Sequence, residues 1–178
     1  MRLLLHPFFT QASPATKTMT TQPESPENMD AQTLAEKTAA QLWAQDQATQ
    51  NLGMSLVRVA PGQAVLRMTV QAHMLNGHQT CHGGYLFTLA DSAFAFACNS
   101  HNQNTVAAAC SIDFLAPARL GDTLEATATE VALAGRSGVY DVAIRLLRTP
   151  TRPNTPTDES TTVALFRGKS HTIKGTVL

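Results

Sequence analysis

A single carboxylate interrupts the longest nearly apolar run of this 178-residue sequence. Asp91 is the only charged residue between Gly84 and Cys98, in a run of Ala, Leu and Phe that predicts a helix buried on all sides. A carboxylate in such surroundings is costly unless it is paired or hydrogen-bonded, and its pKa is liable to be perturbed. Asp91 is therefore a candidate general base or nucleophile. The alternative is a structural carboxylate at a solvated edge of the helix, and residue type alone leaves both open.

Two adjacent glycines, Gly83 and Gly84, stand at the start of the same run, after the segment NGHQTCH. The first backbone N–H groups of a helix lack intrahelical acceptors and lie at the positive end of its dipole. They could hold an anionic or developing-anionic oxygen, although the glycines could equally serve a tight turn or close packing. The spacing of His78, Cys81 and His82 also suggests zinc, but no second ligand cluster follows downstream. We therefore expect no metal.

Three basic residues alternate near the C-terminus. Arg167, Lys169 and His171 share one face if this segment is a strand, and no acidic residue occurs from position 165 to the end. Arg136 adds a cation at the preceding hairpin. The pattern suits a phosphorylated ligand, and it also suits an ordinary solvated face of a sheet.

The elements that must position these residues follow from the periodicity. Residues 30–50 predict a helix N-capped by Asp30, and the run 85–98 predicts a second helix. Alternating apolar and polar residues predict strands at 54–60 and 63–70, then at 106–114, 123–133, 140–146 and 161–174. We therefore expect an α+β domain in which a curved antiparallel sheet of five to six strands wraps around the long apolar helix, with an N-terminal helix beside it.

Composition bounds the domain organisation and the partners. Residues 1–30 predict a disordered N-terminal extension, 31–178 a single domain, and 149–160 a loop rich in Pro, Thr and Ser. The 13 basic and 13 acidic residues cancel, so we expect neither nucleic acid nor membrane as a partner. Three cysteines without C-x-x-C spacing favour a reducing compartment, and we expect a cytoplasmic protein. No P-loop, G-x-G-x-x-G or G-x-S-x-G motif is present, which disfavours nucleotide hydrolysis, Rossmann chemistry and an α/β-hydrolase triad.

The segment from Asn76 to Asn99, NGHQTCHGGYLFTLADSAFAFACN, closely resembles the acyl-CoA thioesterases of phenylacetate degradation, the PaaI type of the hot-dog superfamily. The similarity extends from about residue 35 to the C-terminus. Its most specific feature is HGG followed by Asp eight residues after the first of these glycines. It also includes SIDFL from Ser111, GVYD from Gly138 and ALFRGKSH from Ala164.

This resemblance implies a hot-dog fold and hydrolysis of aromatic acyl-CoA thioesters such as phenylacetyl-CoA and hydroxyphenylacetyl-CoA. It implies that Asp91 is the catalytic carboxylate, that the Gly83 N–H is the oxyanion donor, and that Asn76 positions the water or the carbonyl. Ser111 matches a polar position that helps to orient the water, and His82 is expected to orient the turn. The remaining residues expected at the substrate and its coenzyme A phosphates are His82, Gly84, Arg136, Ser137, Gly138, Arg167 and Lys169. Coenzyme A is then part of the substrate, and no separate cofactor is expected.

One geometric consequence comes from the helix itself. Gly83 and Asp91 are separated by about 12 Å along the axis of one helix, so both cannot reach the same thioester carbonyl at hydrogen-bonding distance. If both are catalytic, they come from two chains and the active site lies at a homodimer interface; the resemblance further implies a homotetramer. Two alternatives remain from the sequence. A hot-dog enoyl-CoA hydratase would favour an Asp/His pair on the helix, which has no His from Tyr85 to Cys98, and a non-catalytic acyl-CoA-binding module would not require Asp91.

Overall fold

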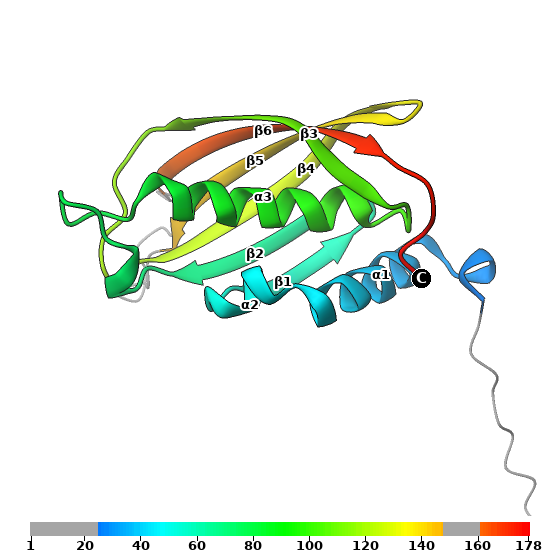
Figure 1. The fold of residues 1–178 in the computed structure, drawn as a ribbon, viewed down its shortest axis with the longest axis horizontal. Coiled ribbons are helices and arrows are strands. Elements are labelled where there is room, and N and C mark those ends of the chain that lie inside the picture. Colours follow the sequence, from blue (N-terminus) through cyan, green and yellow to red (C-terminus); the bar gives the residue numbers. More distant parts are fainter. Residues whose placement is uncertain (1–24, 148–160) are drawn as a thin grey trace, which may run out of the picture.

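A six-stranded antiparallel sheet curves around one long helix in the computed structural model, which describes residues 25–147 and 161–178 (Figure 1). The strand order is β1-β2-β4-β5-β6-β3, so the last strand inserts beside β3. The predicted α+β class is therefore confirmed. In chain order the elements are η1 (Pro26–Asn28), α1 (Ala31–Gln45), α2 (Gln47–Asn51), β1 (Ser55–Ala60), β2 (Gln63–Thr69), η2 (Ala72–Met74), α3 (Gly83–Asn99), β3 (Thr105–Phe114), β4 (Thr123–Ala134), β5 (Ser137–Leu147) and β6 (Thr162–Thr172).

The N-terminal helix begins where the sequence predicts and ends earlier. Asp30 caps α1, because its carboxylate accepts the backbone N–H groups of Gln32 and Thr33 at 3.0 and 3.1 Å. The predicted helix over 30–50 is interrupted at Asp46, whose carboxylate accepts the N–H of Thr49 at 2.9 Å and starts α2. The interruption has no Gly or Pro to announce it. It forms because the Asp46 carboxylate caps the free amides at the start of α2, just as Asp30 caps those of α1.

Aromatic packing sets the depth of α3 against the sheet. The Phe94 ring lies 5.4 Å from the ring of Tyr140 on β5 and 5.9 Å from that of Phe166 on β6, centroid to centroid. Phe87 meets Phe166 at 5.4 Å. A Cβ at Gly168 would lie 2.9 Å from the Phe94 ring, so a glycine is needed where the helix approaches β6. Each fully buried side chain of this size stabilises the fold by roughly 1.5–3 kcal/mol.

The edge strand β3 runs alongside α3 in the opposite direction. At the C-terminus of α3 the Asn99 side chain donates to the Thr105 carbonyl and accepts the Thr105 N–H, both at 2.9 Å. At the N-terminus a Cβ on Gly83 would lie 2.9 Å from the ring of Phe114, the last residue of β3. Both ends of the helix are therefore fixed to the same strand.

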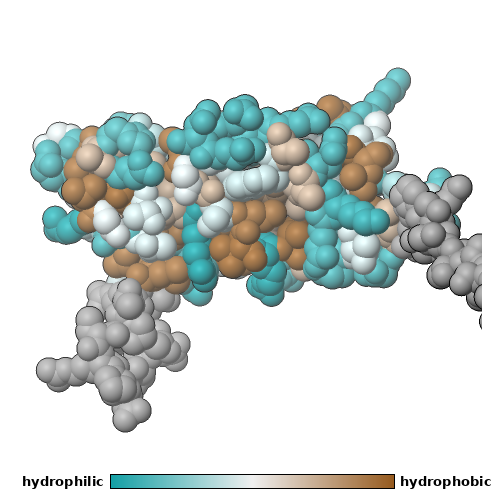
Figure 2. Space-filling view, turned by 90° about the horizontal axis from the view of Figure 1, so that it is seen from below, coloured by the Kyte–Doolittle hydropathy of each residue, from teal (hydrophilic) through white to brown (hydrophobic). Residues whose placement is uncertain are grey.

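The two edges of the sheet differ in their surroundings. At the β1 edge, the Gln32 side chain of α1 donates to the Val59 carbonyl at 2.9 Å, and Figure 2 shows this side of the molecule, where apolar patches are interspersed with hydrophilic side chains. The other edge is β3, which carries no charged side chain from Thr105 to Ile112 and exposes 46% of Val106. Edge strands usually carry charges that prevent pairing with another chain. The composition of β3 favours such pairing.

The structure describes only part of the predicted domain division of the chain. Residues 1–24 of the expected N-terminal extension, and the loop expected at 149–160, lie outside the described residues. Of the rest of that extension, Pro26–Asn28 form a 3-10 turn immediately before α1. The boundary at residue 30 stays a prediction. No helix in the described ranges has the length and apolar character needed to cross a membrane.

Candidate active site

One backbone amide at the start of α3 is left free. His82 is the N-cap residue, its Nδ1 accepts the Gly84 N–H at 2.9 Å, and its carbonyl accepts the Tyr85 N–H at 3.0 Å. Within residues 25–147 and 161–178, the Gly83 N–H has no hydrogen-bond acceptor. Since Nδ1 accepts a hydrogen bond, the His82 ring must carry its proton on Nε2. The cap therefore holds the helix terminus and presents the Gly83 amide at the positive end of the dipole.

Asn76 organises the loop that precedes this terminus. Its Oδ1 accepts the backbone N–H groups of His78 at 2.9 Å and Thr80 at 3.2 Å, and the Asn76 N–H donates to the Thr80 carbonyl at 2.8 Å. The Nδ2 group has no hydrogen-bond partner in the part of the chain that the structure describes. Asn76 thus uses its oxygen for the loop and keeps two N–H donors for a ligand.

Asp91 lies at the middle of the solvent-facing stripe of α3. Gly84, Thr88 and Ala95 share this stripe, and Asp91 is half-buried within it. Burial raises the pKa of the Asp91 carboxyl above its usual value. Across the described ranges no Lys, Arg or His forms an ion pair with Asp91, so no positive charge offsets that effect. The carboxylate is consequently unengaged and more basic than an ordinary Asp.

Two thiols lie close enough to Asp91 to register its charge. Burial raises the pKa of Cys98 to about 12, with a further contribution from the Asp91 carboxylate. Burial also raises the pKa of Cys110 on β3, and Asp91 adds to that effect. All three cysteines of the chain are free. Both thiols therefore stay protonated near neutral pH, so neither supplies a thiolate beside Asp91.

The free amide and the carboxylate belong to one uninterrupted helix. Gly83 is the first residue of α3 and Asp91 lies eight residues further on. A rise of about 1.5 Å per residue separates them by about 12 Å along the axis. The Gly83 amide and the Asp91 carboxylate of a single chain are therefore too far apart to contact the same small ligand group.

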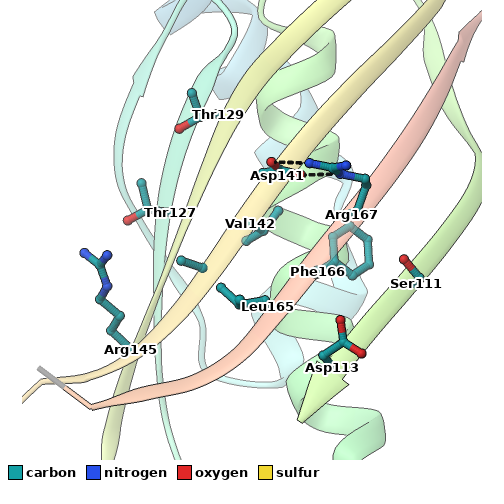
Figure 3. Close-up of a pocket in the computed structure, with 11 residues that line it drawn as sticks. Ser111, Asp113, Thr127, Thr129, Asp141, Val142, Arg145, Leu165, Phe166 and Arg167 are labelled. Carbon is teal, nitrogen blue, oxygen red and sulfur yellow. Dashed lines mark hydrogen bonds and ion pairs between the residues drawn. The ribbon is translucent and has the colours of Figure 1, made fainter. Parts of the chain in front are cut away.

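Within one chain the structure does not bring Ser111 to Asp91, and the role expected for it stays a prediction. Ser111 pairs with Arg167 on β6, while its neighbours Cys110 and Ile112 pair with Gly168 and Phe166. Phe166 and Gly168 meet the rings of α3, and side chains alternate between the faces of a strand. Ser111 therefore points away from α3, as Figure 3 shows with the helix behind the sheet. On β3 the side chain facing the helix beside Asp91 is that of Cys110.

The basic residues of β6 lie on the same outer face. Arg167 donates from Nε and Nη2 to the two carboxylate oxygens of Asp141, both at 2.7 Å (Figure 3). This pairing raises the pKa of Arg167 and lowers that of Asp141. Lys169 is exposed on the same face. The structure thus confirms the shared face predicted for Arg167 and Lys169, but it does not bring them to α3.

The turn between β4 and β5 lies at the other end of α3 from Gly83. The Arg136 Nε donates to the Thr172 carbonyl at 2.8 Å, and Thr172 pairs with Thr105, which is hydrogen-bonded to Asn99 at the end of α3. Ser137 and Gly138 follow this turn as the first residues of β5. A helix of this length spans about 25 Å, so within one chain these residues cannot share a ligand with Gly83.

Two side-chain contacts in this region were not predicted from the sequence. Tyr85 of α3 packs edge-on against His73 of η2, with centroids 6.0 Å apart, and both line a hollow beside the Gly83 amide. In addition, the hydroxyl groups of Thr49 and Ser92 form a buried hydrogen bond of 2.9 Å between α2 and α3. Both contacts join segments that are distant or differently folded, so local periodicity could not predict them. In the described residues no cluster of three or more His, Cys, Asp or Glu could hold a metal.

Comparison with known proteins shows the class of protein to which the chain belongs. The family model described as Thioesterase superfamily matches residues 78–150. The structure of the PaaI protein from the phenylacetic acid degradation operon of E. coli superposes with a TM-score of 0.75 at 46% identity, covering 83% of this chain and 99% of that one. A mutant of the phenylacetic acid degradation protein PaaI from Thermus thermophilus superposes with a TM-score of 0.63 at 37% identity, covering 72% of this chain and all of that one.

A curated relative narrows the class to a group. The acyl-coenzyme A thioesterase PaaI of Escherichia coli strain K12 is 48% identical over 136 residues, which is 76% of this chain and 89% of that protein. The chain belongs to the thioesterase superfamily, in its PaaI-type group of hot-dog acyl-CoA thioesterases.

Proposed function

We propose that this enzyme hydrolyses aromatic acyl-CoA thioesters of the phenylacetyl-CoA and hydroxyphenylacetyl-CoA type, releasing the free acid and coenzyme A in phenylacetate catabolism. The observation that carries the proposal is the pair of unengaged groups on α3: a free Gly83 amide at the positive helix end and a half-buried, unpaired Asp91 carboxylate. Support for the substrate class comes from the similar E. coli protein, which belongs to the phenylacetic acid degradation operon.

The working unit that we propose is a homodimer formed through the free edge of β3. Two β3 strands paired across a two-fold axis would place two α3 helices side by side and antiparallel. In that arrangement the Gly83 amide of one chain lies opposite Asp91 of the other, which brings the two groups to one carbonyl. The uncharged edge from Thr105 to Ile112 supports this pairing.

The same pairing gives the β4–β5 turn a role. With the helices antiparallel, the C-terminal end of one α3 extends past the Gly83 end of the other. Arg136, Ser137 and Gly138 lie at that C-terminal end, so they would flank the partner's Asn76 loop, where a coenzyme A phosphate needs a cation. Leu165 exposes 46% of its surface on the outer face of the sheet, and this face supports a second contact that would make a homotetramer.

The proposed reaction uses these groups and water, without a separate cofactor. The thioester oxygen accepts the Gly83 N–H, which with the helix dipole stabilises the negative charge formed on attack. The Asn76 Nδ2 donors hold the water or the carbonyl in place. Asp91 either takes a proton from the attacking water or attacks the carbonyl carbon itself. The C–S bond then breaks, and the sulfur leaves with its electron pair as the coenzyme A thiolate. If water attacked, the acyl group leaves directly as the acid. If Asp91 attacked, the acyl group remains on it as an anhydride, which water hydrolyses to the acid and the free Asp91 carboxylate.

Replacing the carboxylate tests the assignment. Asp91→Asn should lower thiol release from phenylacetyl-CoA by about a thousandfold, while binding of a non-hydrolysable thioether analogue, measured by calorimetry, stays near that of the wild type. Asp113→Asn is the matched control, because Asp113 lies on the outer face of β3, and it should retain wild-type turnover. Hydrolysis by Asp91→Asn within tenfold of the wild type would exclude Asp91 as the catalytic group.

A further inference from the structure

A hollow of about 510 Å³ lies beside the N-terminus of α3, on the side that faces the end of α2. Its wall is formed by Leu52, His73, Leu75, His82, Gly84, Tyr85 and Thr88. We propose that this hollow holds the aromatic ring of the acyl group, and that Tyr85 and His73 determine the preference for aromatic over aliphatic thioesters. The inference rests on the proposed function and adds to it the residues that select the substrate.

The hollow lies next to the place where the thioester carbonyl would be held. Gly84 lines it and directly follows Gly83, whose amide is free for the carbonyl oxygen. The far wall is tied to the helix start, because the Met74 carbonyl of η2 accepts the His82 N–H at 2.8 Å. In a phenylacetyl group one methylene separates the ring from the carbonyl. A ring on so short a tether has to bind next to the carbonyl, and this hollow is adjacent to the amide.

The lining offers contacts that favour a ring. Tyr85 packs edge-on against His73 at 6.0 Å and against His82 at 6.5 Å, with interplanar angles of 80° and 84°. These neighbours hold the Tyr85 ring, and its hydroxyl donates to the His73 carbonyl at 3.4 Å. Aromatic rings prefer such edge-to-face contacts, which stabilise a pair of rings beyond the apolar area that they bury. A saturated chain would bury apolar surface on Leu52 and Leu75 but would gain no contact of this kind.

The polar groups of the same wall suit a ring hydroxyl. Because the Tyr85 hydroxyl donates its proton to a backbone carbonyl, its oxygen is left to accept one from the substrate. A hydroxyl on the acyl ring can donate to that oxygen. This accounts for both the phenyl and the hydroxyphenyl members of the proposed substrate class in one site.

A second hollow of about 270 Å³ lies on the other side of Asp91, between Leu42 of α1 and Ala95 and Phe96 of α3. In the antiparallel pairing of two α3 helices, the turn that carries Ala95 lies opposite the partner's loop 76–80, which would cover this hollow. The hollow next to Gly84 is therefore the one left to the acyl group. This pair of sites also provides a matched control.

The test compares two leucines that are both partly buried against the core. The ratio of kcat/KM for phenylacetyl-CoA to kcat/KM for hexanoyl-CoA is measured for the wild type, Leu52→Trp and Leu42→Trp. Leu52→Trp fills the hollow beside Gly84 and should lower the ratio about tenfold or more, whereas Leu42→Trp should leave it within about twofold. Tyr85→Ala should also lower the ratio, and Tyr85→Phe should restore it for phenylacetyl-CoA but not for 4-hydroxyphenylacetyl-CoA.

Each outcome decides between the two proposals. An unchanged ratio in Leu52→Trp and Tyr85→Ala, or a fall in Leu42→Trp alone, overturns the assignment of the ring to this hollow. If Leu52→Trp does not fold, as judged by its circular dichroism melting curve, the two Tyr85 variants carry the test. A wild type that releases no thiol from any acyl-CoA contradicts the proposed function instead, whereas one that hydrolyses hexanoyl-CoA but not phenylacetyl-CoA overturns the aromatic assignment.

Discussion

The ionised form of the Asp91 side chain lowers the stability of the folded chain. The carboxylate is half-buried, burial raises its pKa, and within the described ranges no cation pairs with it. A residue selected only for stability at this position would be neutral, since an uncompensated buried charge destabilises a folded chain. The same burial makes the carboxylate more basic, and the lack of a paired cation in the described ranges leaves it available to a ligand.

The cost predicts how stability depends on pH at this residue. Because the pKa of Asp91 is raised in the folded chain, the stabilising contribution of its proton is complete below the unfolded-state pKa and is lost as pH rises through the folded-state pKa. Asp91→Asn should therefore have a higher Tm than the wild type at pH 7, and the difference should shrink as pH falls towards 4. Thermal unfolding by circular dichroism at a series of pH values measures this. A lower Tm for the variant at neutral pH would contradict it.

At the scale of elements, α3 carries both proposed catalytic groups and contacts β3 at both ends. Asn99 bonds to the first residue of the strand, and Gly83 lies against the ring of Phe114 at its end. The packing of α3 against the sheet thus sets the position of the helix N-terminus and the direction of the Gly83 N–H. A small shift of this terminus would misplace the oxyanion donor.

A methyl group at this contact should therefore impair catalysis. The Cβ of Gly83→Ala would lie 2.9 Å from the Phe114 ring, and such overpacking costs about 1–3 kcal/mol. We expect kcat to fall about tenfold to a hundredfold, because displacement of a catalytic group by about 1 Å has effects of this size. Gly77→Ala is the control: its Cβ would meet nothing within 4 Å, so Tm and kcat should stay at the wild-type values. Equal turnover by both variants would argue against the close contact as a catalytic constraint.

At the scale of the whole molecule, the proposed active site needs groups from two chains. The separation of Gly83 and Asp91 along α3 and the uncharged edge of β3 both favour a second copy. The β4–β5 turn gains its proposed contact with coenzyme A only in that dimer. Substrate contacts would then come from both chains, so dissociation of the dimer would abolish activity without unfolding either chain.

Mixing two inactive variants tests shared sites. Asp91→Ala removes the carboxylate, and Gly83→Pro removes the amide donor. Proline has the backbone conformation of a first helical residue, and its Cβ also presses on the Phe114 ring. A heterodimer of the two has one site with both groups intact. Unfolding and refolding an equal mixture should therefore restore about a quarter of the wild-type thiol release, since half of randomly formed dimers are mixed and each has one working site. No recovery in heterodimers verified by mass spectrometry would refute the shared site.

The sequence by itself determined the features that depend on residue type and local spacing. The apolar run and its lone carboxylate predicted α3 and Asp91, the glycines predicted the helix start, and Asp30 predicted the beginning of α1. Alternation predicted all six strands to within a few residues. The separation of Gly83 and Asp91 followed from helix geometry alone. These conclusions need no knowledge of which segments are neighbours in space.

Only the tertiary structure decided which side chains share a surface. Ser111 is two residues from Asp113 and one from Cys110, and nothing local shows which of them faces α3; the pairing of β3 with β6 settles that Cys110 does. The His73–Tyr85 contact depends in the same way on where the chain returns. The physical reason is that strand pairing and core packing join residues far apart in the chain, and a slip of one position in a strand reverses its faces.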